Sequence, residues 1–283
     1  MLHEVSMVRQ AAIDSMRTDA AGRYRFRVAA PDTGALYLVS STRAGIAYFS
    51  QPLRLSPRAS VTADSLTVYD TSATGTPVRV ERRLLTIARA RADGSRDVLE
   101  VLELRNPDLV TRIAADTTHP TWRGRLPAGA IQFQVGESDF SPQAVALHGD
   151  TILVFGPVQP GLSRQLSFSY VLPATANAVA IPVDQGIGEL HLLIEDTTAT
   201  LAAGVSLARS TEDIEGREFR SYSSQSVPAG TPLLVRLPPG RPASERALPW
   251  LVGGMMAALV LGLGFALRRR PASPAPATAT RQG

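Results

Sequence analysis

The chain contains neither cysteine nor lysine. Without cysteine it can form no disulfide, thiolate nucleophile or cysteine-based metal site. The 29 basic residues are therefore all arginines, and they are scattered among 25 acidic residues. They form no basic stripe, and no aromatic residues recur at a spacing suited to stacking on bases. We therefore expect no nucleic-acid binding, although the net charge is +4.

Local catalytic motifs are also missing. The sequence has no His-Glu-x-x-His, no Gly-x-Ser-x-Gly, no phosphate-binding loop and no EF-hand loop. Its four histidines stand singly, although His119, His148 and Asp150 could meet in space as zinc ligands. A zinc site needs three converging ligands, and isolated histidines are far more common on surfaces or in cores. We therefore predict no enzymatic activity, no catalytic residue, no metal and no cofactor.

Two further patterns carry little chemistry. Glu212, Asp213 and Glu215 could offer oxygen ligands to Ca²⁺, but their spacing fits no calcium loop, so we expect a solvated loop. Gly186 and Gly188 follow a strand-like run without the third glycine and the helix of a dinucleotide-binding motif. We interpret this pair as a turn.

One long apolar run dominates the C-terminal part. Residues 247–267 include no charged residue, and Arg268, Arg269 and Arg270 follow directly. As a helix, 21 residues span about 30 Å, the thickness of a bilayer's hydrocarbon core. Because positive residues stay on the cytoplasmic side, the arginines set the topology. We predict a single-pass protein of the inner membrane, with residues 1 to about 245 outside and a disordered cytoplasmic tail at 268–283.

The apolar run also contains a stripe of small residues. Gly254, Ala258 and Gly262 recur every four positions and would share one face of the helix. Such a stripe lets a second helix approach closely, although glycine and alanine are common in membrane helices without this role. Helix-helix association is therefore one expected partnership, beside the lipid bilayer itself.

The rest of the chain predicts β-structure. Short runs of alternating apolar residues are separated by Gly, Pro, Asp and Ser, which is the pattern of an all-β sandwich. The runs at 79–91 and 97–105 flank Asp93-Gly94 and predict a hairpin. Other expected strands are 23–28, 35–40, 131–135, 144–148, 151–155, 165–172, 178–183, 189–196, 217–222 and 232–237.

Turn-forming clusters suggest the domain boundaries. Residues 56–58 (Ser-Pro-Arg) end a first domain, 1–58, and residues 173–175 (Pro-Ala-Thr) separate 60–173 from 174–240. The last segment adds strands either to the same sandwich or to a third domain. Residues 238–242 form a stiff, proline-rich connector to the apolar run.

Residues 14–55 carry a recognisable pattern. In the run TDAAGRYRF at 18–26, Asp19 can bond the turn backbone, Gly22 can take a left-handed conformation, and Tyr24 and Phe26 can enter a core. With Leu-Tyr-Leu-Val at 36–39 and Tyr-Phe at 48–49, this segment resembles the carboxypeptidase regulatory-like domain. The resemblance implies a transthyretin-like β-sandwich, used without catalysis for adhesion, docking or stability in bacterial envelope proteins.

The resemblance is incomplete at its start. The family pattern opens with a Gly-x-Val strand and a second strand, whereas Met1 begins inside that second strand, so the first strand is missing. A sandwich without its first strand exposes an unpaired edge. Residues 1–16 also include no apolar signal sequence. We expect either an upstream start with an export signal or a tail-anchored protein with its β-domains in the cytosol.

These observations favour one function and leave two alternatives. The first is a non-enzymatic, membrane-anchored envelope protein whose tandem transthyretin- or Ig-like sandwiches bind a protein partner as a scaffold. The second is a module that binds glycan or another small ligand, with Trp122, Tyr222 and Phe140 exposed along one groove and Trp122 stacking on the ligand. The third is an accessory subunit of a membrane complex, held through the small-residue stripe.

Overall fold

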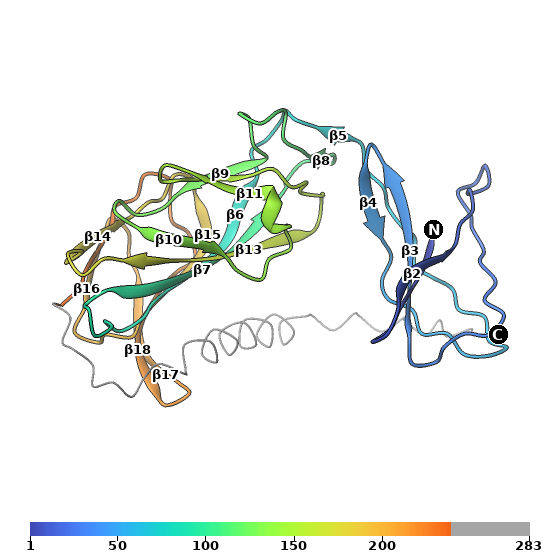
Figure 1. Cartoon of the computed structure of the whole chain (residues 1–283). Helices are drawn as coiled ribbons and strands as arrows, with labels where there is room; N and C mark the ends of the chain where they lie inside the picture. The colour runs from blue at the N-terminus through green and yellow to red at the C-terminus, as the bar shows by residue number, and fades with distance from the viewer. Residues whose placement is uncertain (239–283) are drawn as a thin grey trace, which may run out of the picture.

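The computed structural model describes residues 1–238, which form two β units placed end to end (Figure 1). Within this range the chain forms 19 strands and one short 3-10 helix, Pro142–Ala144, so the all-β prediction is confirmed. No helix in residues 1–238 is long and apolar enough to cross a membrane. The predicted span at 247–267, its stripe of Gly254, Ala258 and Gly262, and the arginines at 268–270 lie outside the described residues.

The N-terminal unit is one antiparallel sheet with the order β2-β1-β3-β4. Its buried core is small and consists of Leu2, Ala35, Tyr37 and Val39. Leu66 also packs against this core, so the unit continues past the boundary predicted at residue 58. The strand bounds are Leu2–Val5 (β1), Gln10–Asp14 (β2), Leu36–Arg43 (β3) and Ile46–Phe49 (β4).

The turn at Asp19 forms as predicted. Its Oδ1 accepts the backbone N–H groups of Ala21 at 2.9 Å and Arg23 at 2.8 Å. Gly22 has a φ of +76°, a left-handed conformation that glycine adopts without the penalty of a Cβ. The side chain of Asp19 therefore replaces the backbone partners that a tight turn would otherwise leave unpaired.

The strand predicted at 23–28 is wrong. These residues form no β-ladder, although Tyr24, Phe26 and Val28 pack against the small core while the intervening arginines are exposed. A β-strand is defined by backbone hydrogen bonds to a neighbouring strand, and no strand of the described part of the unit pairs with this segment. The alternating pattern therefore predicted which side chains face inward but not the pairing.

The larger unit packs one seven-stranded sheet against two three-stranded sheets. The large sheet has the order β10-β13-β7-β6-β15-β18-β17, and the small sheets have the orders β11-β12-β9 and β14-β19-β16. Its strands are Arg79–Ile87 (β6), Arg96–Arg105 (β7), Ile131–Val135 (β10), Ser163–Leu172 (β13), Ile187–Ile194 (β15), Ala208–Ile214 (β17) and Arg217–Ser224 (β18). Those of the small sheets are Trp122–Arg125 (β9), Val145–His148 (β11), Thr151–Val154 (β12), Ala178–Ile181 (β14), Thr200–Ala203 (β16) and Leu233–Arg236 (β19).

Residues 174–238 belong to the same unit as the residues before them. β15 lies parallel to β6 in the middle of the large sheet, with Leu190 opposite Arg83 and Ile194 opposite Ile87. One apolar cluster includes buried side chains from the large sheet and from both small sheets. The described part of the chain beyond residue 78 is therefore a single sandwich-like domain. The predicted hairpin of β6 and β7 is confirmed, with Gly94 at a φ of +83°.

The glycine pair at 186–188 is not the predicted turn, because Gly188 lies inside β15. A Cβ on Gly188 would lie only 2.6 Å from the carbonyl oxygen of Glu81. In β6, the register shifts between Val80 and Arg82, so the Glu81 backbone bulges toward this point. Gly188 is therefore required by the close approach of two central strands.

A polar joint connects the two units. β5 (Thr71–Ser72) and β8 (Thr111–Arg112) form a short parallel pair between them (Figure 1). From β4, the buried Tyr48 hydroxyl donates to the carbonyl oxygen of Tyr69 at 3.1 Å and lies 2.8 Å from Thr111 Oγ1. Arg43 Nε also donates to Asp70 Oδ1 at 2.8 Å. These contacts bind the small unit to residues 69 and 70 of the connecting segment and to Thr111 of the large unit.

Candidate functional site

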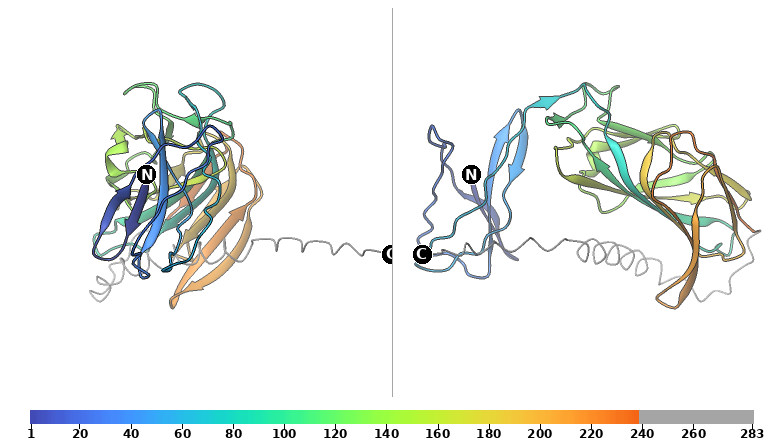
Figure 2. Two further views of the ribbon diagram at one scale, coloured as in Figure 1. Left: turned by 90° about the vertical axis from the view of Figure 1, so that its right-hand side faces the viewer. Right: turned by 180° about the vertical axis from the view of Figure 1, so that it is seen from behind.

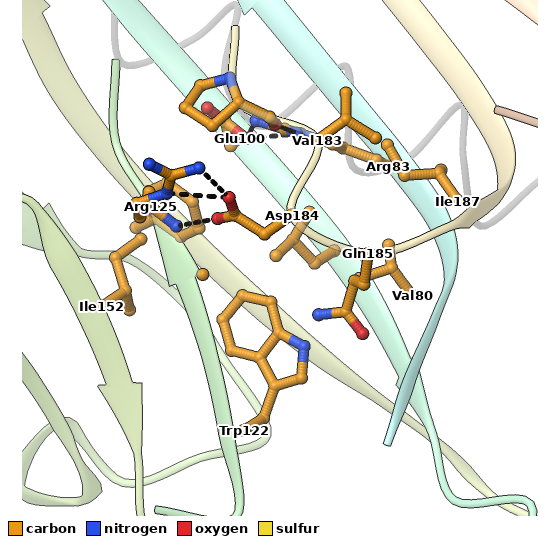
Figure 3. Close-up of a pocket in the computed structure, with 14 residues that line it drawn as sticks. Val80, Arg83, Glu100, Trp122, Arg125, Ile152, Val183, Asp184, Gln185 and Ile187 are labelled. Carbon is orange, nitrogen blue, oxygen red and sulfur yellow. Dashed lines mark hydrogen bonds and ion pairs between the residues drawn. The ribbon is translucent and has the colours of Figure 1, made fainter. Parts of the chain in front are cut away.

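A small pocket with charged, polar and apolar side chains lies in the larger unit (Figure 3). It lies between the large sheet, the loop at 182–187 and the β9-β12 pair, and its volume is about 30 Å³. The lining side chains that carry charged or hydrogen-bonding groups are Arg83, Glu100, Trp122, Arg125, Asp184 and Gln185.

A buried ion pair forms the inner wall of this pocket. The Arg83 Nε donates to Glu100 Oε2 at 2.8 Å, and its Nη1 donates to the carbonyl oxygen of Pro182 at 2.6 Å. The hydroxyl of Tyr170 donates to Glu100 Oε1 at 2.8 Å. Arg83 is 7% exposed, and Glu100 and Tyr170 are each 1% exposed. The three residues lie on the adjacent strands β6, β7 and β13, which place them on one face of the sheet.

The electrostatics of this triad favour a fixed network. Burial, followed by the negative charge of Glu100, raises the pKa of Tyr170 well above its usual value, so its hydroxyl stays a donor. Both carboxylate oxygens of Glu100 already accept a hydrogen bond. A buried charge is tolerated when its partners satisfy it in this way. The three groups join the adjacent strands β6, β7 and β13 of one sheet, and Arg83 also joins them to the loop at Pro182.

A second ion pair lies at the mouth of the pocket. Arg125 Nε donates to Asp184 Oδ1 at 2.7 Å, and the backbone N–H of Arg125 donates to Asp184 Oδ2 at 3.0 Å (Figure 3). Gln185 completes the wall when its amide oxygen accepts from Trp122 Nε1 and its amide nitrogen donates to the carbonyl oxygen of Val78 at 2.9 Å. The loop at 182–187 is thus connected to β9 and to the residue before β6.

Trp122, predicted as a ligand-stacking platform, is part of the core. Trp122 and Tyr222 are each 7% exposed, and Phe140 is 2% exposed. The indole ring lies over Gly124, where a Cβ would come within 2.5 Å of it. All three aromatic side chains fill space between sheets, so the exposed aromatic groove that the glycan alternative needs does not form. That prediction is wrong because a sandwich of this size needs large apolar side chains inside.

The candidate metal ligands are not brought together. Within residues 1–238, no group of three or more His, Asp or Glu side chains could hold a metal ion. His119 instead pairs with Asp116, its Nδ1 lying 2.9 Å from Oδ2, while His148 is exposed at the end of β11. Glu212 and Asp213 lie on β17 rather than in the expected loop.

A polar network covers part of the outer face of the large sheet. Arg82 bonds both Glu103, at 2.7 Å, and Glu189, at 3.0 Å, and Glu189 Oε1 lies 2.9 Å from His191 Nε2. Burial is the main cause that raises the pKa of Glu103, and the negative charge of Glu81 adds to it. The hydrogen bond from His191 is the main cause that lowers the pKa of Glu189. The pKa values of Glu103 and Glu189 thus shift in opposite directions, although both carboxylates pair with Arg82 across strands of the same sheet.

A groove lined by both apolar and polar side chains was not predicted. It lies between β16, the edge of one small sheet, and the start of β17, the edge of the large sheet, and its volume is about 340 Å³. It is lined by Thr200, Leu201, Ala203, Val205, Leu207, Arg209 and Tyr222. The apolar residues at 201, 203, 205 and 207 alternate along the sequence and are only partly buried. This alternation was the signal available beforehand, and we interpret the groove as an unfilled gap between two sheet edges.

Comparison with known proteins gives little further information. No protein-family model matches the chain, and no curated protein matches it. Similar solved structures include an M1 zinc metallopeptidase of Deinococcus radiodurans, at 13% identity and a TM-score of 0.35. A protein of Parabacteroides distasonis named as a protease has 16% identity and a TM-score of 0.38. Each match covers 56% of this chain, and 42% and 39% of the other chains, respectively. The chain thus spans less than half the length of either, and at these TM-scores the likeness supports no inference about activity.

Proposed function

We propose that this chain is a non-enzymatic, single-pass membrane protein of the bacterial envelope, whose two β units act as an interaction scaffold outside the membrane. The observation that carries the proposal is the open groove between β16 and β17, which is lined by both apolar and polar side chains and flanked by strands that are edges of their sheets within residues 1–238. Partly exposed apolar surface at sheet edges is a common site for protein association. The uncharged run at 247–267 and the arginines after it support the anchor.

The joint between the two units supports a scaffolding role. Tyr48 is 2% exposed and Thr111 is 0% exposed, so their contact is closed to solvent. The backbone of Ala47 also accepts a hydrogen bond from Gln159 Nε2 at 3.4 Å. A chain held at such a joint presents its two units in a defined arrangement, as a spacer or platform requires.

The regulatory-like assignment of residues 1–58 is part of this proposal. The Asp19 turn, the left-handed Gly22 and the inward-facing Tyr24 and Phe26 support it. The buried Arg83-Glu100-Tyr170 triad fits the same account, since its polar atoms are spent on joining strands. The proposal therefore gives the groove, rather than the interior pocket, the functional contact.

A cross-linking experiment in membranes tests this proposal. The full-length chain, tagged at its own locus, should recover the same cross-linked envelope proteins in repeated preparations. Thr200→Arg places a long charged side chain in the groove and should remove most of that recovery, because β16 lines the groove there. Thr42→Arg, at an exposed position of β3, is the matched control and should leave it unchanged. Recovery no greater than from untagged cells, or equal loss in both variants, would contradict the proposal.

A further inference from the structure

β17 is the longest open edge among the described strands. It has seven residues, lies at the end of the large sheet and pairs with β18 over its whole length without a register shift. The hairpin of β17 and β18 projects from the sandwich in both views of Figure 2. Six of the seven residues of β17 are exposed, and only Ile214 is partly buried. Within residues 1–238, no strand pairs with the outer edge of β17.

The opposite edge of the same sheet is protected. β10 has five residues, and its pairing with β13 is interrupted between Ile131 and Gln134. Gln132 has a φ of +55°, which turns the strand out of regular pairing. Bulges of this kind are one way in which proteins block pairing at an edge. Unlike the edge of β10, the edge of β17 therefore keeps the regular geometry that a further strand needs for pairing.

Two of the three charged residues of β17, Arg209 and Asp213, are complementary to each other in an antiparallel pair. If two copies of the strand lie antiparallel about a two-fold axis at Thr211, Arg209 of each copy is directly opposite Asp213 of the other. Their side chains share one face of the strand, since Arg209 is paired with Tyr222 and Asp213 with Glu218 across β18. Opposite charges at directly facing positions stabilise antiparallel pairs, and like charges destabilise them. The arrangement forms two such pairs by symmetry.

The groove lies beside the same edge. Leu207, directly before β17, and Arg209, within it, line the groove together with Leu201 of β16. A strand added to β17 therefore extends the large sheet next to the open gap between the sheets. In the antiparallel register residue 209 of one copy is opposite residue 213 of the other, so the two grooves lie at opposite ends of the paired strands.

We propose that β17 pairs with β17 of a second copy of this chain, antiparallel about a two-fold axis at Thr211. The two large sheets then continue as one across the dimer, which is an isologous interface. This inference rests on the proposed scaffold function and names one of its partners, a second copy of the chain. It requires that the outer edge of β17 is unpaired in the cell.

Cysteine cross-linking of the full-length chain in detergent tests the register. The chain has no native cysteine, so Thr211→Cys introduces the sole thiol. Directly opposed residues in antiparallel strands have Cα atoms about 4.5–5.5 Å apart, which suits a disulfide. Oxidation should therefore link most Thr211→Cys chains into dimers. Ser210→Cys is the matched control, because in this register two such cysteines are displaced by about 7 Å along the strands and cannot be bridged.

Charge reversal tests the pairing without cysteine. Arg209→Asp and Asp213→Arg should each weaken dimerisation by about tenfold or more in sedimentation measurements, because each change places like charges opposite one another. The double variant restores opposite charges and should recover the dimer. This rescue matters because Asp213 Oδ1 also accepts the N–H of Gly216, so the single change alone could disturb the hairpin.

The outcomes separate clearly. Selective cross-linking at residue 211 together with rescue in the double variant supports the pairing. A wild-type chain that stays monomeric, equal cross-linking of both cysteine variants, or a double variant as weak as the single ones overturns it. The envelope cross-linking described above does not depend on residue 211, so the scaffold and the self-pairing can fail independently.

Discussion

Replacement of Arg83 by methionine is expected to lower the free energy of unfolding by about 3–5 kcal/mol. The change leaves the Glu100 carboxylate buried with only the Tyr170 hydroxyl as donor. It also removes the donor to the Pro182 carbonyl oxygen. A buried charge that loses its partner keeps its desolvation cost without the attraction that offset it. Denaturant unfolding of the full-length chain, followed by Trp122 fluorescence in a Trp250→Phe background, measures the loss.

Two further variants identify the cause. Arg105→Met removes a half-exposed ion pair with Glu81 and should cost about 1 kcal/mol or less. A triple variant, Arg83→Met with Glu100→Leu and Tyr170→Phe, removes every member of the triad and should recover most of the lost stability. A loss for Arg83→Met as small as that for Arg105→Met would show that the buried network contributes little.

Gly188→Ala is expected to lower the free energy of unfolding by about 1–3 kcal/mol. The added Cβ would lie 2.6 Å from the Glu81 carbonyl oxygen, which is backbone and cannot rotate away. The strands β6 and β15 must therefore separate at the centre of the large sheet. The same denaturant experiment, read at Trp122, gives the value.

Gly186→Ala is the matched control for that change. Its new Cβ would lie 3.8 Å from the carbonyl oxygen of Val227, an ordinary contact. The free energy of unfolding should change by no more than about 0.5 kcal/mol. Equal effects at the two glycines would contradict a steric role for Gly188 and indicate a general cost of losing glycine.

Strands with one buried face could be predicted from the sequence. The bounds at 131–135 were predicted without error, and 151–155 and 217–222 differ from β12 and β18 by one and two residues, respectively. β17 could not be found in this way, because an exposed edge strand has no apolar alternation. Its position is set by the two-residue turn Glu215-Gly216, whose φ values of +54° and +76° suit a hairpin. That turn was the signal that the sequence offered.

The polar sites were harder to predict. Arg83 and Glu100 lie in strands whose apolar residues alternate with polar ones. In the sequence, a charged residue at a position that faces the core resembles a break in that alternation. Their meeting depends on the hairpin register, in which Glu100 is opposite Leu85, two residues from Arg83 on the same face. Tyr170 joins them from β13, 70 residues from Glu100 along the chain. Only the assembled sheet brings all three together.

Sidedness in the membrane tests the central claim most directly. Because the chain has no cysteine, one introduced thiol reports its own location to a maleimide that cannot cross membranes. Thr117, exposed before β9, and Ser273, in the tail, are suitable positions for cysteine in the chain expressed from its own locus. We predict that Thr117→Cys is labelled in intact spheroplasts and that Ser273→Cys is labelled only after lysis. Protection of Thr117→Cys before lysis, or labelling of Ser273→Cys from outside, would contradict the account.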